Sequence, residues 1–146
     1  MLKEGYIVGW DHRARDKFCR EPDDYILTYP EGGLTQQDFY HKCEAVIMTT
    51  DTFENLPRVA FEAMASGSVL VVDKRGGWRS LVEDRVTGWL CQDDREFVYK
   101  ASRCAFEAEE REQMRYAAHD RLDAIAGFAV ASESWEKVFA EWERLR

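Results

Sequence analysis

Two glutamates, Glu54 and Glu62, flank the start of a segment with helix-forming character, and seven residues lie between them. Pro57 suits the first turn of that helix, because the missing N–H of proline would have no partner there. At about 1.5 Å per helical residue, Glu62 lies about 7.5 Å along the axis from Pro57. Free N–H groups and the positive dipole end of a helix start stabilise a phosphate, while flanking carboxylates accept hydrogen bonds from sugar hydroxyls. This is the chemistry that a nucleotide sugar requires, and two solvated glutamates are the alternative.

Other residues that carry chemistry predict no metal centre and no dinucleotide fingerprint. Zinc-ligand spacing is absent among the three histidines, His12, His41 and His119. No CxxC pair occurs among the cysteines, which we expect to be reduced and mostly buried: Cys19, Cys43, Cys91 and Cys104. Two adjacent acidic pairs suit loops or helix starts rather than a metal site: Asp23-Asp24 and Asp93-Asp94. A Rossmann oxidoreductase is excluded because no G-x-G-x-x-G follows the first apolar run.

Composition excludes further classes of function. The 146 residues are 45% hydrophobic, enough for the core of one domain spanning residues 1–146. With 20 basic and 28 acidic residues the formal charge is −8, so nucleic acid is not an expected partner. A small diphosphate is still compatible with this charge, because backbone amides and a few cations act locally. No apolar run approaches the ~20 residues of a bilayer span, so we expect no transmembrane segment and a cytoplasmic location.

Short apolar runs alternate with helix-like segments through the first half of the chain, which predicts a parallel α/β sheet. These runs are too hydrophobic on both faces for an exposed antiparallel sheet, so helices must cover both faces. The strand candidates are Tyr6 to Trp10, Tyr25 to Tyr29, Ala45 to Thr49, Val69 to Val72 and Gly88 to Cys91.

Helix boundaries are marked by capping residues. Thr35 is expected to cap a helix running to about Lys42, with Asp38 completing a variant of the capping box. The next helix is expected over about 57 to 66, ended by a left-handed Gly67. Beyond residue 92 the pattern is helical, and we expect these helices to cover the sheet with apolar positions at Phe97, Ala101, Ala105, Met114 to Leu122, Trp135, Val138, Phe139 and Trp142.

A long ordered segment of the chain resembles a known family. The resemblance covers the run from Thr49 to Val72, the pair Gly76-Gly77, and the run from Leu81 to Leu90. Together they are similar to the donor domain of retaining GT-B glycosyltransferases of the GT4 type, the glycosyl transferases group 1. Ser134-Trp135-Glu136 resembles the tryptophan-containing helix that ends such domains. The resemblance implies a Rossmann-like parallel sheet flanked by helices, the C-terminal half of a GT-B fold, with a helical tail.

The resemblance also implies roles for individual residues. Glu54 would be the catalytic residue that contacts the donor sugar, and Glu62 would bind the ribose hydroxyls. The loop would lie against the sugar and diphosphate through Asn55, Leu56, Pro57, Arg58 and Val59. Gly76 and Gly77 would turn the chain near the cleft, unless their turn is purely structural. The leaving diphosphate would be neutralised by a cluster of cations, Arg13, Arg15 and Lys17. The alternative is that these three residues are a solvated charge cluster at the surface.

These roles imply a donor-binding domain of a retaining, metal-independent glycosyltransferase that moves a hexosyl group from an NDP-sugar substrate without a cofactor. Pro57 departs from the family pattern because it lacks an amide donor, and Ser80 stands where a glutamate is common. The acceptor lobe of such enzymes is expected to come from a preceding N-terminal lobe or a partner chain. The alternative is a degenerate, non-catalytic GT-B-like binding or scaffold module.

Overall fold

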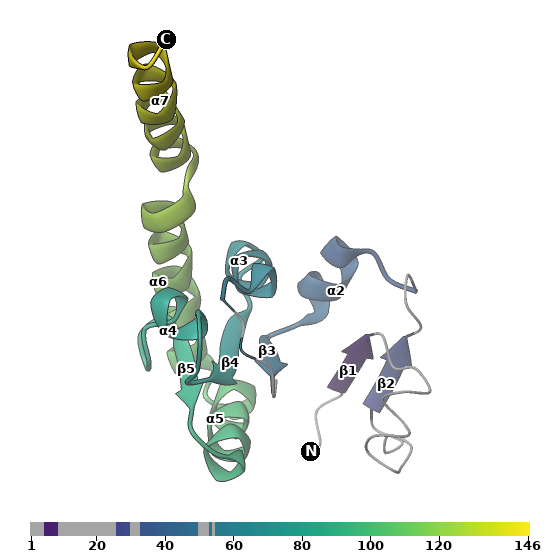
Figure 1. Ribbon diagram of the computed structural model, residues 1–146. Helices are drawn as coiled ribbons and strands as arrows, with labels where there is room; N and C mark the ends of the chain where they lie inside the picture. Colours follow the sequence, from purple (N-terminus) through teal and green to yellow (C-terminus); the bar gives the residue numbers. More distant parts are fainter. Residues whose placement is uncertain (1–4, 9–25, 30–32, 50–52, 54) are drawn as a thin grey trace. The chain divides into compact units, whose positions relative to one another are not determined.

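The computed structural model describes residues 5–8, 26–29, 33–49, 53 and 55–146, and the chain divides into two units, Met1–Glu44 and Ala45–Arg146 (Figure 1). In the first unit, β1 (Gly5–Val8) pairs in parallel with β2 (Ile26–Tyr29). α2 (Gln36–Lys42) follows. Its N-cap is Thr35, whose hydroxyl oxygen accepts a hydrogen bond from the Asp38 N–H at 3.1 Å, as the sequence predicts.

The second unit is built on a parallel sheet of order β3-β4-β5, comprising β3 (Ala45–Met48), β4 (Val69–Asp73) and β5 (Gly88–Cys91). Ala45 pairs with Val69, and Leu70 pairs with Gly88. β4 is the central strand, and its first four residues are buried. A strand flanked on both sides and covered on both faces needs apolar residues at every position, which explains the uninterrupted run Val69–Val72. The parallel sheet is therefore confirmed.

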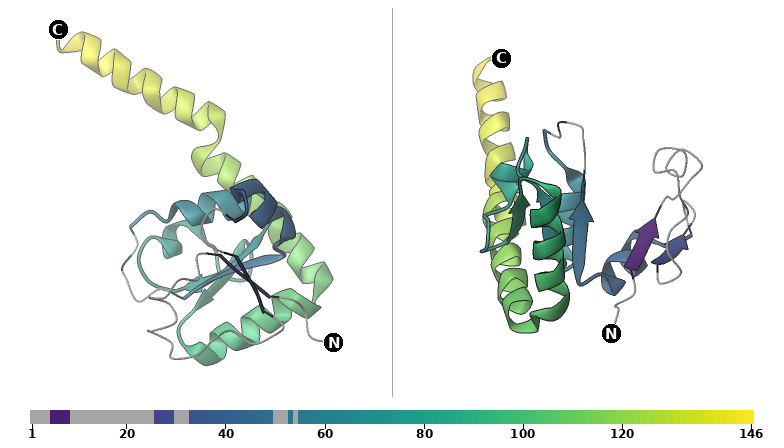
Figure 2. Two further views of the ribbon diagram at one scale, coloured as in Figure 1. Left: turned by 90° about the vertical axis from the view of Figure 1, so that its right-hand side faces the viewer. Right: turned by 90° about the horizontal axis from the view of Figure 1, so that it is seen from below.

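Helices follow each strand of this unit: α3 (Arg58–Ala65), α4 (Trp78–Leu81), α5 (Asp94–Phe106), α6 (Ala108–Ala126) and α7 (Phe128–Arg144). α5 and α6 pack against the sheet (Figure 2). They contribute Cys104 and Met114 to a core cluster that also contains Val69, Val71, Trp89 and Cys91. α3 packs on β4 and α6 through Ala60 and Ala63, which are fully buried.

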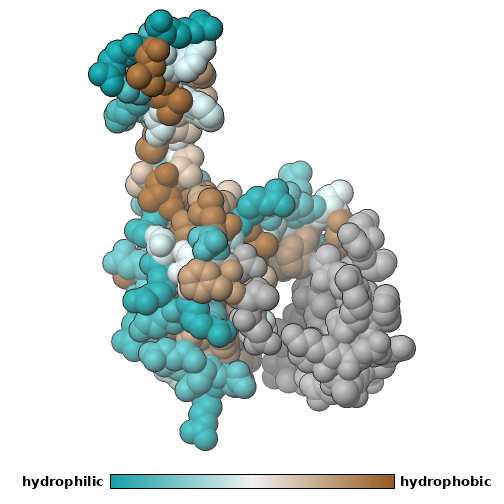
Figure 3. Space-filling view, in the orientation of Figure 1, coloured by the Kyte–Doolittle hydropathy of each residue, from teal (hydrophilic) through white to brown (hydrophobic). Residues whose placement is uncertain are grey.

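The last helix corrects the expectation that the whole tail covers the sheet. α7 contributes no buried residue, and its stacked pair Trp135 and Phe139 is 61% and 57% exposed. α6 is 19 residues long, which is about 28 Å, whereas a five-residue strand is about 17 Å long. α6 therefore already spans the sheet, and α7 continues beyond it, where Figure 3 shows apolar residues at the surface. No helix in the described ranges is both long enough and apolar enough to cross a membrane.

Two glycines occupy positions that other residues fit poorly. Gly67 has φ +74° just past the end of α3, which confirms the predicted left-handed C-cap. A methyl group at Gly88 would lie 2.8 Å from the carbonyl oxygen of Leu70 and 3.2 Å from Cγ1 of Val82. The β4–β5 pairing therefore depends on the missing side chain at Gly88.

Cys43, Cys91 and Cys104 are not in disulfide bonds, so they are reduced, as expected. Cys91 and Cys104 are buried, and Cys43 is half-buried. Burial raises the pKa of the Cys91 and Cys104 thiols to about 11, so both are protonated at neutral pH. Cys19 lies outside the described residues.

Candidate functional site

Three connections leave the same edge of the sheet in the second unit. β3, β4 and β5 are parallel, so their carboxyl ends meet at one edge, where ligands of open α/β sheets usually bind. β3 leads through residues 49–57 into α3, β4 leads through residues 74–77 into α4, and β5 leads through residues 92–93 into α5. Each connection places a helix start at this edge.

Among the residues that the structure describes, no side chain caps the start of α3. Pro57 is the N-cap, one residue before the first turn in which it was expected, and it makes no side-chain hydrogen bond to the helix. It is buried, whereas Asn55, Leu56 and Arg58 are exposed and Val59 is half-buried. The first turn contains no acidic residue. Its amide groups and positive dipole end are thus not matched by a carboxylate of the helix itself.

Glu62 lies four residues after Arg58 on α3, which places both residues on the same face of the helix. Its side chain is half-buried. The predicted catalytic residue, Glu54, lies outside the described residues, and so do the cations Arg13, Arg15 and Lys17. Their roles stay predictions.

The Gly76-Gly77 turn connects β4 to α4. Gly76 has φ +58°, a left-handed conformation that glycine adopts without strain, and Gly77 is the N-cap of α4. The far end of α4 is held by Arg121 of α6, whose guanidinium donates to the carbonyl oxygens of Ser80 at 2.7 Å and Leu81 at 2.6 Å. The turn is thereby fixed between a strand and an anchored helix. Neither α4 nor this anchor was predicted from the sequence.

A cavity of about 480 Å³ opens between this turn and the start of α5. Charged residues of both signs line it, together with Cys91, Gln92 and Phe97: Asp73, Lys74, Arg75, Arg79, Asp93 and Asp94. Arg75 closes on Asp73 through two hydrogen bonds of 2.7 Å, from Nε and Nη2. Sequence reasoning missed this cavity, although Arg75, one of its charged residues, directly precedes the glycine pair that the resemblance singled out.

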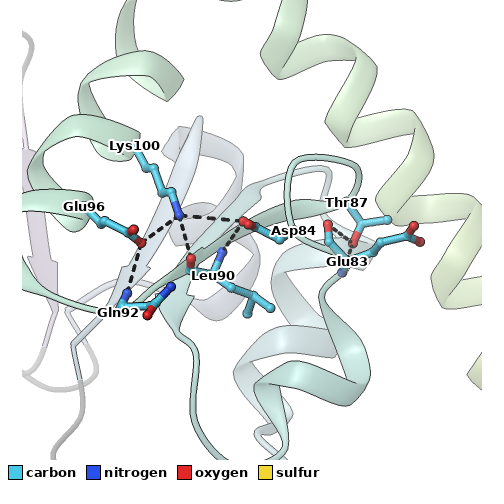
Figure 4. Close-up of polar contacts among 7 residues, drawn as sticks. All are labelled: Glu83, Asp84, Thr87, Leu90, Gln92, Glu96 and Lys100. Atoms are coloured by element: carbon cyan, nitrogen blue, oxygen red, sulfur yellow. Dashed lines mark hydrogen bonds and ion pairs between the residues drawn. The ribbon is translucent and has the colours of Figure 1, made fainter.

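The start of α5 is capped by its own carboxylates, and Figure 4 shows the contact of one of them, Glu96, with Gln92. Asp93 is the N-cap and accepts a hydrogen bond from the Glu96 N–H at 2.9 Å. The Glu96 carboxylate accepts one in return from the Gln92 N–H at 3.1 Å. Asp94 and Glu96 also place negative charge in the first turn, where the helix dipole favours it. This helix start is satisfied from within the chain.

Lys100 fastens α5 to the end of β5. Its side chain is 8% exposed, and Nζ donates to the Leu90 carbonyl oxygen at 2.6 Å and to Glu96 at 2.9 Å. Asp84 lies 3.8 Å from Nζ and accepts a hydrogen bond from the Leu90 N–H at 2.9 Å (Figure 4). The hydrogen bond from Lys100, followed by that from the Gln92 N–H, lowers the pKa of Glu96. We call these contacts of Lys100 with Leu90 and Glu96 the clamp. The i, i+4 spacing of Glu96 and Lys100 is the sequence signal that could have revealed it.

Known proteins resemble this chain in sequence and in fold. A curated relative, the lipopolysaccharide 1,2-N-acetylglucosaminetransferase of Salmonella typhimurium, is 28% identical over 87 residues, which are 60% of this chain and 23% of that protein. Anabaena HepE in complex with UDP-glucose superposes with a TM-score of 0.77 and 18% identity, over 94% of this chain and 41% of that one. Sucrose-phosphate synthase of Thermosynechococcus elongatus superposes with a TM-score of 0.82 and 16% identity, over 97% of this chain and 39% of that one.

The chain thus spans about a quarter of the curated relative and about two fifths of these solved chains. Its sheet, flanking helices and helical tail match the Rossmann-like half of a GT-B glycosyltransferase. The sequence profile of the glycosyl transferases group 1 matches residues 35–121, more than half of the chain. This protein belongs to the glycosyl transferases group 1 family.

Proposed function

We propose that the second unit binds a nucleotide sugar at the start of α3, as the donor-binding half of a glycosyltransferase. The observation that supports this most is the contrast between helix starts at one sheet edge. No described side chain caps α3 and its first turn contains no acidic residue, whereas Asp93 and Glu96 cap α5. A diphosphate gains most where N–H groups and the positive dipole end have no carboxylate of their own.

The donor would lie along α3. Its diphosphate would face the first turn beside the exposed Arg58, and its ribose hydroxyls would reach Glu62, about 6 Å further along the helix axis. The transferred sugar would then extend toward the predicted contact, Glu54. Pro57 offers no amide donor, so Arg58 and the amides after it would bear the phosphate contacts.

The donor class is proposed from the chemistry of the relatives. HepE was solved with UDP-glucose, and the Salmonella relative is named for N-acetylglucosamine transfer. We therefore propose a hexosyl donor, with UDP-sugars as the first to test. Transfer would retain configuration and need no divalent metal, as the resemblance implies, because positive groups at the site would stabilise the leaving diphosphate.

Transfer would also need an acceptor-binding lobe across the cleft, since holding both substrates in register supplies much of such a rate. This chain covers 41% of the HepE chain. We propose that the other lobe comes from an N-terminal segment or from a partner chain, and that the described domain by itself binds donor more readily than it transfers sugar.

Titration calorimetry with UDP-glucose, GDP-mannose and ADP-glucose tests the donor site. We expect one of these to bind, and Glu62→Ala to weaken its binding about tenfold, because charged hydrogen bonds to the ribose are lost. Glu109→Ala, on the exposed side of α6, is the matched control and should bind like the unchanged chain. The proposal fails if no nucleotide sugar binds, or if Glu62→Ala binds as well as the control while both variants keep the original melting temperature.

A degenerate, non-catalytic module is the second candidate. The exposed aromatic residues of α7 favour it, because they offer a partner an apolar surface that a donor site does not require. A folded chain that binds none of the three nucleotide sugars would support this alternative.

A further inference from the structure

We propose that the cavity between the Gly76-Gly77 turn and the start of α5 binds a neutral saccharide, one sugar unit of the acceptor. The role of this saccharide as part of the acceptor rests on the proposed function, whereas the saccharide site itself rests on the cavity alone. At about 480 Å³ the cavity falls within the ~300–1,000 Å³ range of small-molecule sites. Its walls come from β4, β5, α4 and α5 of one unit.

The balance of charge in the cavity selects a neutral ligand. Arg75 and Asp73 satisfy each other through their two hydrogen bonds. The other described charged residues that line the cavity are two cations and two carboxylates, Lys74, Arg79, Asp93 and Asp94. An anion would meet both carboxylates, and a cation would meet Lys74 and Arg79, so either charged ligand encounters repulsion as well as attraction.

Hydroxyl groups suit this mixed lining. A hydroxyl donates to a carboxylate and accepts from an ammonium or guanidinium group, so a molecule with several hydroxyls can satisfy both kinds of wall at once. The exposed amide of Gln92 adds a donor and an acceptor. Phe97, half-buried against the core cluster, supplies an apolar wall for the C–H face of a sugar ring.

Both walls are held in place without a ligand. Lys100 and Glu96 fix the start of α5 (Figure 4), together with the Asp93 cap. Arg121 fixes the end of α4, on the other side of the glycine pair. A pre-formed site avoids the entropic cost of ordering its walls when a ligand binds.

The cavity also lies at the sheet edge that the proposed donor would occupy. Neighbouring strands are about 4.8 Å apart, so the ends of β3 and β5 are about 10 Å apart across β4. An acceptor hydroxyl must come within about 3.5 Å of the carbon it attacks. A sugar unit in the cavity would anchor the acceptor from this side while the second lobe held its remainder.

Amide NMR shifts of the full 146-residue chain test the proposal. The probes are glucose, galactose, N-acetylglucosamine and maltose at millimolar concentration, with inorganic phosphate as the anionic comparison. We expect at least one saccharide to shift the amides of Lys74–Arg79 and Gln92–Asp94. The double variant Lys74→Ala/Arg79→Ala should weaken that binding about tenfold. Arg95→Ala, an exposed cation of the α5 first turn that does not line the cavity, should not.

The inference is overturned if no saccharide shifts these amides, if phosphate shifts them and the saccharides do not, or if the double variant binds like Arg95→Ala. UDP-glucose added to the same sample reports on the donor site through Arg58–Glu62. Loss of the saccharide response with an intact donor response defeats this inference alone. The reverse result defeats the proposed donor site and leaves the saccharide site standing.

Discussion

Two helix starts at one edge of the sheet, those of α3 and α5, are built in opposite ways. In α5, Asp93 accepts a hydrogen bond from the Glu96 N–H, and the Glu96 carboxylate accepts one from the Gln92 N–H. Lys100 donates a further hydrogen bond to Glu96. α3 begins after Pro57, has no acidic residue in its first turn, and is capped by no side chain in the described part of the chain. A helix start that serves stability satisfies its own donors, whereas one that serves a phosphate leaves them for the ligand. Substitutions at the two helix starts test this difference, and the largest effect is expected at Lys100.

Removing the clamp behind α5 should cost the most. In Lys100→Ala, the Leu90 carbonyl and Glu96 lose a charged donor in a nearly buried position, so the free energy of unfolding should fall by about 2–3 kcal/mol. Urea denaturation measures the loss. Lys137→Ala on α7, where the ion pair with Glu133 is exposed, should stay within about 0.5 kcal/mol. Equal losses in the two variants would show that Lys100 does not hold the α5 start.

Adding a carboxylate to the first turn of α3 should make it resemble α5. In Arg58→Glu, the new charge competes with phosphate for the helix start, so UDP-glucose binding should weaken at least about tenfold while stability holds or rises by about 0.3 kcal/mol. Calorimetry and melting report the two effects. Arg95→Glu makes the same change in the first turn of α5 and should leave nucleotide binding unchanged. Similar losses of binding in both variants would remove the distinction between the two helices.

Removing the cap of α5 should cost less than removing the clamp. In Asp93→Ala, the Glu96 N–H loses its acceptor, so the free energy of unfolding should fall by about 1 kcal/mol. Asp94→Ala, one residue further on, loses only the favourable position of its charge and should cost about 0.3 kcal/mol. Denaturation curves that rank the two variants the other way would contradict the capping assignment.

The smallest effect concerns acid. Hydrogen bonds from Lys100 and the Gln92 N–H lower the folded-state pKa of Glu96 below its ordinary value of 4.5. The unfolded chain therefore binds this proton more readily, and the stabilisation is fully present above about pH 4.5 and is lost as the pH falls through the lowered pKa. Glu96→Gln should lack this component, so its stability difference from the unchanged chain should shrink between pH 6 and pH 3. A stability difference between the two chains that stays constant from pH 6 to pH 3 would contradict the lowered pKa of Glu96.

Local signals in the sequence predicted much of the fold. Thr35 and Gly67 were placed correctly because N-caps and left-handed C-caps depend on a single residue type and its immediate neighbours. The β4 strand was recognisable because burial on both faces leaves no alternation. α4, with four residues, is too short for any periodic pattern to reveal it.

Longer-range features could not be predicted in the same way. The apolar spacing of Trp135 and Phe139 predicts one apolar face, but whether that face is covered depends on how far α6 extends past the sheet. The anchor from Arg121 to Ser80 joins residues 41 positions apart, which no local pattern records. At the candidate site, the α3 start was predicted to within one residue. The cavity was not predicted, because the start of α5 approaches the β4–α4 turn only in the folded chain.

The missing side chain at Gly88 has a consequence for genetics. The smallest possible change there, to alanine, places a methyl group against the Leu70 carbonyl oxygen, so the substitution separates β5 from β4 without replacing any residue of the candidate site. A screen for alleles that have lost function should therefore recover substitutions of Gly88 as well as substitutions of Glu62. Melting temperature would separate the two classes, because a Gly88 substitution destabilises the fold, whereas a Glu62 substitution leaves the protein folded and, under the proposed function, weakens binding of the nucleotide sugar.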